Sequence, residues 1–84
     1  MYTVHFDEKA LQNLEKLEEK IRKRIFKKIV ATTENPFRYF DRLTGRDEFK
    51  LRIGEYRVIA DINEQSKIIV ILIIDHRKNI YKKL

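Results

Sequence analysis

The sequence predicts an α+β fold in which one strand and two helices precede a three-stranded antiparallel meander, with the helices packed on one face of the sheet. Three observations support this prediction. A short alternating segment opens the chain, apolar residues then recur at helical spacing, and two alternating segments joined by Gly54-Glu55 precede an apolar run. With 84 residues, one Pro and two Gly, the chain is expected to form a single domain over residues 1–84.

The first segment, YTVHF at residues 2–6, alternates apolar and polar side chains as a half-buried strand does. Its apolar side chains are expected to share one face of that strand. His5 then points to the other face, and no role is assigned to it. Asp7 follows directly and is well placed to cap a helix.

Residues 8–34 carry apolar side chains at helical spacing, beginning with Leu11 and Leu14. A single helix of this length would extend about 40 Å, whereas a domain of this size is only about 30 Å across. We therefore expect a break near LEEK at residues 17–20, although no Gly or Pro marks it there. Asn35-Pro36 ends the helical region, and residues 36–47 are expected to form a linker.

The meander begins with EFKLRI at residues 48–53, which alternates and predicts a half-buried strand. Gly54-Glu55 suits a two-residue turn with Gly in the first central position, so YRVIADI at residues 56–62 is expected to return antiparallel to it. The next segment, KIIVILII at residues 67–74, lacks alternation. It therefore predicts a central strand that is covered on both faces.

The register of this hairpin gathers positive charge on one face. With Gly54-Glu55 as the loop, Arg52 lies opposite Arg57, and Lys50 points to the same side as both. Like charges placed opposite each other destabilise a hairpin by several tenths of a kcal/mol. Either the long side chains splay into water, or they form an anion site in which an arginine fork binds phosphate.

The third strand is expected to add a polar group to that face. A four-residue turn at residues 63–66 would put Val70, Leu72 and Ile74 on the side of Arg57, and continued alternation adds His76. Arg77 and Tyr81 follow. A histidine, an arginine and an aromatic side chain are thus expected around one cationic surface, which is a set that can bind RNA.

Composition narrows the classes of partner and of chemistry. Nineteen Lys and Arg against thirteen Asp and Glu give a net charge of +6, which favours polyanionic partners. Cysteine is absent and neither histidine lies at a metal-ligand spacing, so no disulfide, thiolate nucleophile, metal or other cofactor is expected. No signal peptide and no apolar stretch of membrane-spanning length is visible, so we expect a cytoplasmic protein with no membrane partner.

Two segments carry a resemblance to a known family. FKLRIGEYRVIADI and HRKNIY resemble the hairpin, the HR pair and the downstream tyrosine of the RelE/ParE toxin superfamily of type II toxin–antitoxin pairs. FDEKALQNLEKL, ENPF and LTG extend the resemblance more weakly, in the family's order. It implies a β-α-α-β-β-β fold with a helical hairpin. It also implies a cognate antitoxin as partner, in a hetero-oligomeric complex.

Members of this superfamily have two activities. RelE-type toxins are endoribonucleases that cleave messenger RNA on the ribosome, while ParE-type toxins inhibit DNA gyrase. The RelE-type active positions are occupied here, by resemblance, by Lys50, Arg52, Arg57, Arg77 and Tyr81. The resemblance therefore favours a ribosome-dependent, metal-independent nuclease whose partner is the ribosome with messenger RNA in its decoding site. A gyrase inhibitor and a non-catalytic RNA-binding module are the alternatives.

Cleavage by the RNA 2'-hydroxyl needs a base, an acid for the leaving 5'-oxygen, and cations for the developing charge. Arg57 and Arg77 suit the last role. Where RelE enzymes commonly carry a second lysine this chain has Arg52, a poor proton donor, so proton transfer is expected from Lys50 or His76.

The tyrosine has two interpretations. Tyr81 could stack on or orient a base, or it could be a C-terminal aromatic side chain packed on the sheet. It lies only four residues after Arg77, which is closer than in the best-known RelE enzymes. Both interpretations stay open at the level of sequence.

Overall fold

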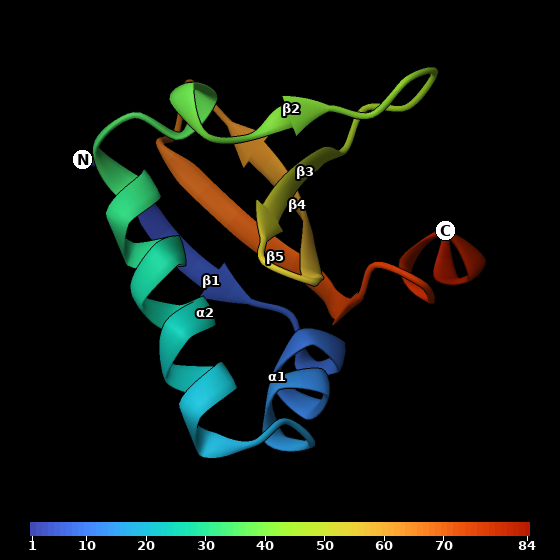
Figure 1. Cartoon of the computed structure of the whole chain (residues 1–84). Helices are drawn as coiled ribbons and strands as arrows, with labels where there is room; N and C mark the ends of the chain where they lie inside the picture. The colour runs from blue at the N-terminus through green and yellow to red at the C-terminus, as the bar shows by residue number, and fades with distance from the viewer.

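The computed structural model describes all 84 residues, and it has one five-stranded sheet with both helices on one face (Figure 1). The longer elements are β1 (Thr3–Phe6), α1 (Glu8–Glu15), α2 (Glu19–Ala31), β2 (Asp41–Arg42), β3 (Phe49–Ile53), β4 (Tyr56–Asn63) and β5 (Ile68–His76). Short 3-10 turns occupy Thr32–Glu34, Pro36–Arg38 and Ile80–Lys83. The strand order is β1-β5-β4-β3-β2, with β1 parallel to β5 and the other pairs antiparallel. The predicted α+β fold is therefore confirmed.

The helix break lies where the size of the molecule requires it. α1 ends at Glu15 and α2 begins at Glu19, although no Gly or Pro separates them. The longest dimension of the molecule is 33 Å, which is shorter than an unbroken helix of residues 8–34 would be. The Arg22 guanidinium donates a hydrogen bond of 2.9 Å to the Leu17 carbonyl and so satisfies one backbone acceptor in the connection. Neither helix has the length and apolar character to cross a membrane.

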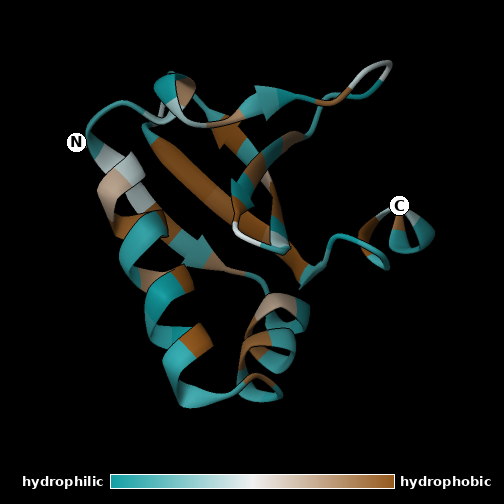
Figure 2. Cartoon of the chain, in the orientation of Figure 1, coloured by the Kyte–Doolittle hydropathy of each residue, from teal (hydrophilic) through white to brown (hydrophobic).

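The main core lies between the helices and the sheet. Ala10 and Leu14 of α1 and Ile25 and Ile29 of α2 are buried there against apolar side chains of the strands. β5 is the most continuously apolar strand, as Figure 2 shows by its colour. This packing explains why two short amphipathic helices are stable, because most helical stability in proteins comes from burying an apolar face.

A smaller apolar cluster covers part of the opposite face of the sheet. It consists of Leu43, Ile59 and Ile80, with Leu72, Ile73 and Leu84 packed against it. Ile80 belongs to the 3-10 turn Ile80–Lys83, hereafter the C-terminal turn, and its side chain is fully buried. β5 is thus covered by the helices on one face and in part by this cluster on the other, which agrees with its lack of alternation. The C-terminal turn is thereby fixed to the face of the sheet that the helices leave open.

The prediction for residues 36–47 is incomplete. This linker contains β2, whose Asp41 and Arg42 pair with Lys50 and Phe49 of β3. The Arg42 guanidinium also lies 4.6 Å from the centre of the Phe49 ring, a cation–π contact that fastens the strand to the sheet. Two residues are too few to show an alternating pattern, so the sequence carried no signal for this strand.

Candidate functional site

The β3–β4 hairpin has the register that its sequence predicts. Arg52 pairs with Arg57 and Lys50 with Ile59, while Leu51, Ile53 and Val58 are buried on the helix side. Gly54 adopts φ of +57° at the first central position of the turn, a conformation that glycine reaches without steric cost. Lys50, Arg52 and Arg57 therefore lie on the face away from the helices, hereafter the cationic face.

The C-terminal turn brings Tyr81 to this face. The Lys50 Nζ donates a hydrogen bond of 2.9 Å to the Tyr81 hydroxyl and lies 5.6 Å from the centre of its ring. Tyr81 itself is 58% exposed, whereas Ile80 beside it is buried. A buried neighbour thus positions Tyr81 while its ring stays open to a ligand. The contact between an amine and a phenol 31 residues apart is the most informative feature of this site.

Arg57 and Arg77 meet at the hairpin turn. The Arg57 Nη1 donates hydrogen bonds of 2.8 Å to the carbonyls of Gly54 and Tyr56. The backbone N–H of Arg77 donates to the Glu55 carbonyl at 2.8 Å, and its Nε lies 2.7 Å from the Glu55 carboxylate. Both guanidinium groups are therefore oriented by the same turn, at one end of the cationic face.

The expectation that His76 joins this face is wrong. Residues Ala60 and Ile71 are paired and so are Ile59 and Ile73, which leaves Leu72 as an extra residue in β5, a β-bulge. One extra residue exchanges the two faces of everything that follows it in a strand.

The bulge divides β5 into two parts, and the side chains after it alternate in the opposite sense to the one expected. Val70, before it, lies on the expected side, and Leu72 packs against the cluster on the open face. Ile74 belongs instead to the core beneath the helices. His76 pairs with Tyr56 on the helix side, with the two rings 5.6 Å apart, and its Nδ1 accepts a hydrogen bond from the Lys78 N–H.

The bulge places Asp75 where His76 was expected. Asp75 pairs with Arg57 in the register, and its carboxylate accepts hydrogen bonds of 2.7 Å from the Lys83 Nζ and the His76 N–H. Burial alone would raise the pKa of Asp75, but these hydrogen bonds outweigh it and hold the pKa below its ordinary value. Sequence reasoning missed this residue because the bulge cannot be read from an unbroken apolar run.

Asp75 should make attachment of the C-terminal turn sensitive to acid. Because its pKa is lower in the folded protein than in the unfolded chain, the ionised carboxylate stabilises the fold at pH values above the unfolded pKa. That contribution is lost as the pH falls through the folded pKa. We expect the NMR signals of the Tyr81 ring to move toward their values in a disordered peptide during acid titration. Asp75→Asn should remove this transition, and an unchanged transition in the variant would assign it to another group.

A pocket of about 430 Å³ adjoins the contact between Lys50 and Tyr81. Arg46, Lys50 and Tyr81 contribute to its lining together with Asp41 and Arg42, so cations and one aromatic ring lie there beside a carboxylate. Such a set can hold phosphate and stack on a base. Sequence reasoning did not find Arg42 and Arg46, because both lie in the segment expected to be a linker. No group of three His, Cys, Asp or Glu side chains is placed to hold a metal ion.

The fold is that of a small toxin class. A family model described as the ParE toxin of type II toxin–antitoxin systems matches residues 4–81. The chain therefore belongs to the RelE/ParE superfamily of type II toxins.

Individual relatives carry RelE names. The RelE4 protein of Methanocaldococcus jannaschii is 33% identical over 78 residues, covering 90% of this chain and 83% of that protein. The mRNA interferase toxin RelE of Escherichia coli K12 is 28% identical over 80 residues, covering 92% and 84%.

Solved structures agree with this assignment. A chain of the toxin–antitoxin complex RelBE2 from Mycobacterium tuberculosis matches with a TM-score of 0.84 at 30% identity, covering 90% of this chain and 98% of that one. A chain of the intact E. coli RelBE toxin–antitoxin complex matches with a TM-score of 0.78 at 25% identity, covering 90% and 96%.

Proposed function

We propose that this toxin is an endoribonuclease that cleaves messenger RNA on the ribosome by metal-independent attack of a ribose 2'-hydroxyl. The observation that carries the proposal is the contact of Lys50 with Tyr81 on a face that also holds Arg52 and Arg57. It joins a proton-carrying amine to an exposed aromatic ring beside guanidinium groups. A relative at 28% identity is named an mRNA interferase, which supports the same activity.

The proposed chemistry forms one bond and breaks one. The 2'-oxygen bonds to the adjacent phosphorus and the bond from phosphorus to the 5'-oxygen breaks, which leaves a 2',3'-cyclic phosphate and a 5'-hydroxyl. The proton that leaves the 2'-hydroxyl passes to water, and a general acid delivers another proton to the 5'-oxygen. Arg57 and Arg77 stabilise the charge on the phosphate oxygens, and Arg52 adds to their field.

Proton transfer is assigned to Lys50 rather than to His76. Lys50 lies on the cationic face, whereas His76 pairs with Tyr56 on the helix side and uses its Nδ1 for a backbone hydrogen bond. The Tyr81 hydroxyl, at 2.9 Å, fixes the position of the Lys50 amine. The Tyr81 ring is exposed and is free to stack on a base of the messenger.

The decisive experiment mixes the purified toxin with ribosomes carrying a defined messenger and maps the cleaved ends. The expected result is cleavage within the decoding site that leaves a 2',3'-cyclic phosphate, with the same messenger uncut when ribosomes are omitted. An intact messenger at toxin concentrations equal to those of the ribosomes would refute the nuclease.

Arg57→Ala should lower the rate of this cleavage at least about a hundredfold, because one donor to a developing charge contributes about that much. The fold should survive, since Arg57 is half-buried and bonds only to backbone carbonyls of its own turn. A thermal melt checks the fold and the ribosome assay checks the rate. A variant that cuts at the wild-type rate would remove Arg57 from the site.

Gyrase inhibition is the second candidate, because the matching family model carries the ParE description. It predicts loss of DNA supercoiling by purified gyrase, with messenger left intact. A binding-only module predicts neither effect. The ribosome assay and a supercoiling assay run side by side therefore separate the three functions.

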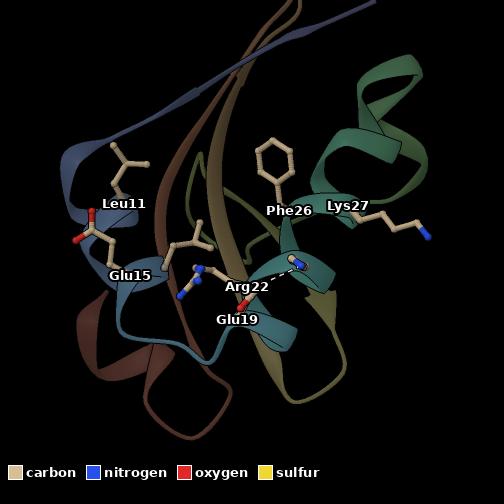
Figure 3. Close-up of a pocket in the computed structure, with 8 residues that line it drawn as sticks. Leu11, Glu15, Glu19, Arg22, Phe26 and Lys27 are labelled. Carbon is tan, nitrogen blue, oxygen red and sulfur yellow. Dashed lines mark ion pairs between the residues drawn. The ribbon is translucent and has the colours of Figure 1, made fainter.

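We further propose that a cognate antitoxin binds the groove between α1 and α2 together with the cationic face. Figure 3 shows the groove, a hollow of about 480 Å³ into which Leu11 and Phe26 project beside charged side chains. Phe26 also stacks on Phe6 of β1, so the apolar surface continues to the sheet edge. The matched RelBE structures are complexes of toxin with antitoxin. An extended or helical segment with apolar and acidic residues fits this surface.

Antitoxin binding is expected to displace residues 79–84 and to move Tyr81 from Lys50. Amide hydrogen exchange in this tail should rise on complex formation while the sheet becomes more protected. The association rate should fall as salt is raised, because opposite charges steer the encounter. Binding of the protein encoded by the neighbouring gene with neither effect would exclude this mode of inhibition.

A further inference from the structure

Helix α2 carries an unbalanced positive charge. Between residues 20 and 33 there is no Asp or Glu, while six side chains are cationic. They are Lys20, Arg22, Lys23, Arg24, Lys27 and Lys28. A solvated helix surface ordinarily carries both positive and negative side chains. Without acidic neighbours on the helix, these cations need partners elsewhere in the chain or in a ligand.

Half of these cations have a partner within the chain. The Lys23 Nζ lies 2.9 Å from the Glu19 carboxylate, Arg22 donates to the Leu17 carbonyl, and the Lys28 Nζ lies 5.2 Å from the centre of the Tyr39 ring. Lys20, Arg24 and Lys27 make no ion pair and no side-chain hydrogen bond. Their spacing of four and three residues places them along one flank of the helix.

This flank faces the end of β3. Arg24, Lys27 and Lys28 line a recess of about 380 Å³ together with Arg52 of the cationic face. Arg24 reaches the hairpin turn, because its Nη2 lies 2.8 Å from the position that a Cβ would take at Gly54. The absence of a side chain at Gly54 thus leaves room for this guanidinium. A positive surface therefore continues from α2 to the proposed catalytic residues.

We propose that this flank of α2 binds the phosphate backbone of folded RNA as a second surface, which adjoins the residues that act on the cleaved phosphate. The inference rests on the proposed function, since that RNA would be the RNA of the ribosome. The exposed apolar side chains of the helical hairpin, Leu11, Phe26 and Val30, are not among the residues that line the recess. The apolar residues that do line it are the small Ala31 and the buried Ile53, so the surface it presents is mainly cationic and suits phosphates better than it suits a protein segment.

The test removes two flank cations that have no assigned part in catalysis. The double variant Arg24→Gln with Lys27→Gln is compared with Lys9→Gln and Lys16→Gln, two exposed lysines at α1 that give the same change in net charge. Binding to a double-stranded RNA of arbitrary sequence is measured over a range of KCl concentrations. We expect the slope of log affinity against log salt to fall by roughly 0.7 to 0.9 for each flank cation removed. An equal loss in the control variant would overturn the proposal.

Cleavage kinetics provide a second readout. On programmed ribosomes, the flank variant should raise KM for the ribosome and leave kcat unchanged, which separates docking from chemistry. A fall in kcat alone would assign the flank to the reaction and overturn the proposal. If the wild-type protein cuts no messenger, the proposed function fails while the RNA-binding comparison still decides the role of the flank. A short oligoglutamate peptide tests the protein alternative, which would replace the proposal if the variant lost affinity for the peptide alone.

Discussion

Replacing Lys50 with alanine is expected to lower messenger cleavage about 10²- to 10⁴-fold, the range that positioned general acids and bases contribute. The loss should exceed that of any other side chain on the cationic face. Lys50 has an ammonium group that can transfer a proton, and its 2.9 Å hydrogen bond to Tyr81 holds that group in place. Arg52 and Arg57 can stabilise charge, but a guanidinium group is a poor proton donor.

The pH dependence of the rate separates proton transfer from electrostatics. Lys50→Ala should abolish one limb of the pH–rate profile, because the group that transfers the proton sets that limb. His76→Ala should leave both limbs in place, since His76 lies on the other side of the sheet. Lys50→Arg keeps the charge without the proton-transfer chemistry and should not restore the rate. A limb that disappears in the His76 variant instead would reverse the assignment.

The register of the hairpin could be predicted because it is fixed locally. A two-residue loop determines which residues of the flanking strands are opposite each other, and Gly54 marked that loop. Alternation in EFKLRI then fixed which side chains are buried. Eight residues of sequence were therefore enough to predict that one face holds Lys50, Arg52 and Arg57. The helix break was accessible by a different argument, from the size of a domain rather than from any local signal.

The third strand could not be predicted in the same way. Its side chains are apolar on both faces, so the sequence KIIVILII gives no signal of where the extra residue at the bulge lies. That one residue moved His76 to the helix side and brought Asp75 opposite Arg57. Tertiary packing decides the position of the bulge, because Leu72 and Ile73 both join the cluster on the open face. Sequence patterns therefore identified the cationic strand residues but not their neighbours from β5.

The C-terminal turn links stability to the candidate site. Ile80 packs in one cluster with Leu43 and Ile59, Lys83 pairs with Asp75, and Tyr81 reaches Lys50. Three contacts of different kinds thus hold one short segment against the open face of the sheet. The ion pair stabilises this attachment only modestly, since solvent screens it. Burial of apolar surface stabilises it most, and Ile80 supplies the fully buried side chain of the turn.

Ile80→Ala should therefore weaken docking of the C-terminal turn by about 2–5 kcal/mol, the range for truncating a buried isoleucine. Because the turn can detach without unfolding the sheet, the effect should appear as faster amide hydrogen exchange at residues 80–83 more than as a lower melting temperature. Cleavage should fall with it, since Tyr81 no longer holds Lys50 in place. This loss of cleavage would result from the displacement of Tyr81, since Ile80 itself has no part in the reaction.

A matched variant, Tyr81→Phe, separates the effect of the buried Ile80 side chain from that of the Tyr81 hydroxyl. Tyr81→Phe removes the 2.9 Å hydrogen bond to Lys50 but keeps the ring and the buried Ile80, so exchange in the turn should stay slow. If the hydroxyl positions Lys50, this variant should lose activity without losing protection, whereas Ile80→Ala should lose both. Full activity in Ile80→Ala with a detached turn would show that Tyr81 only packs on the sheet, and Lys50 would then have to be positioned by the substrate itself.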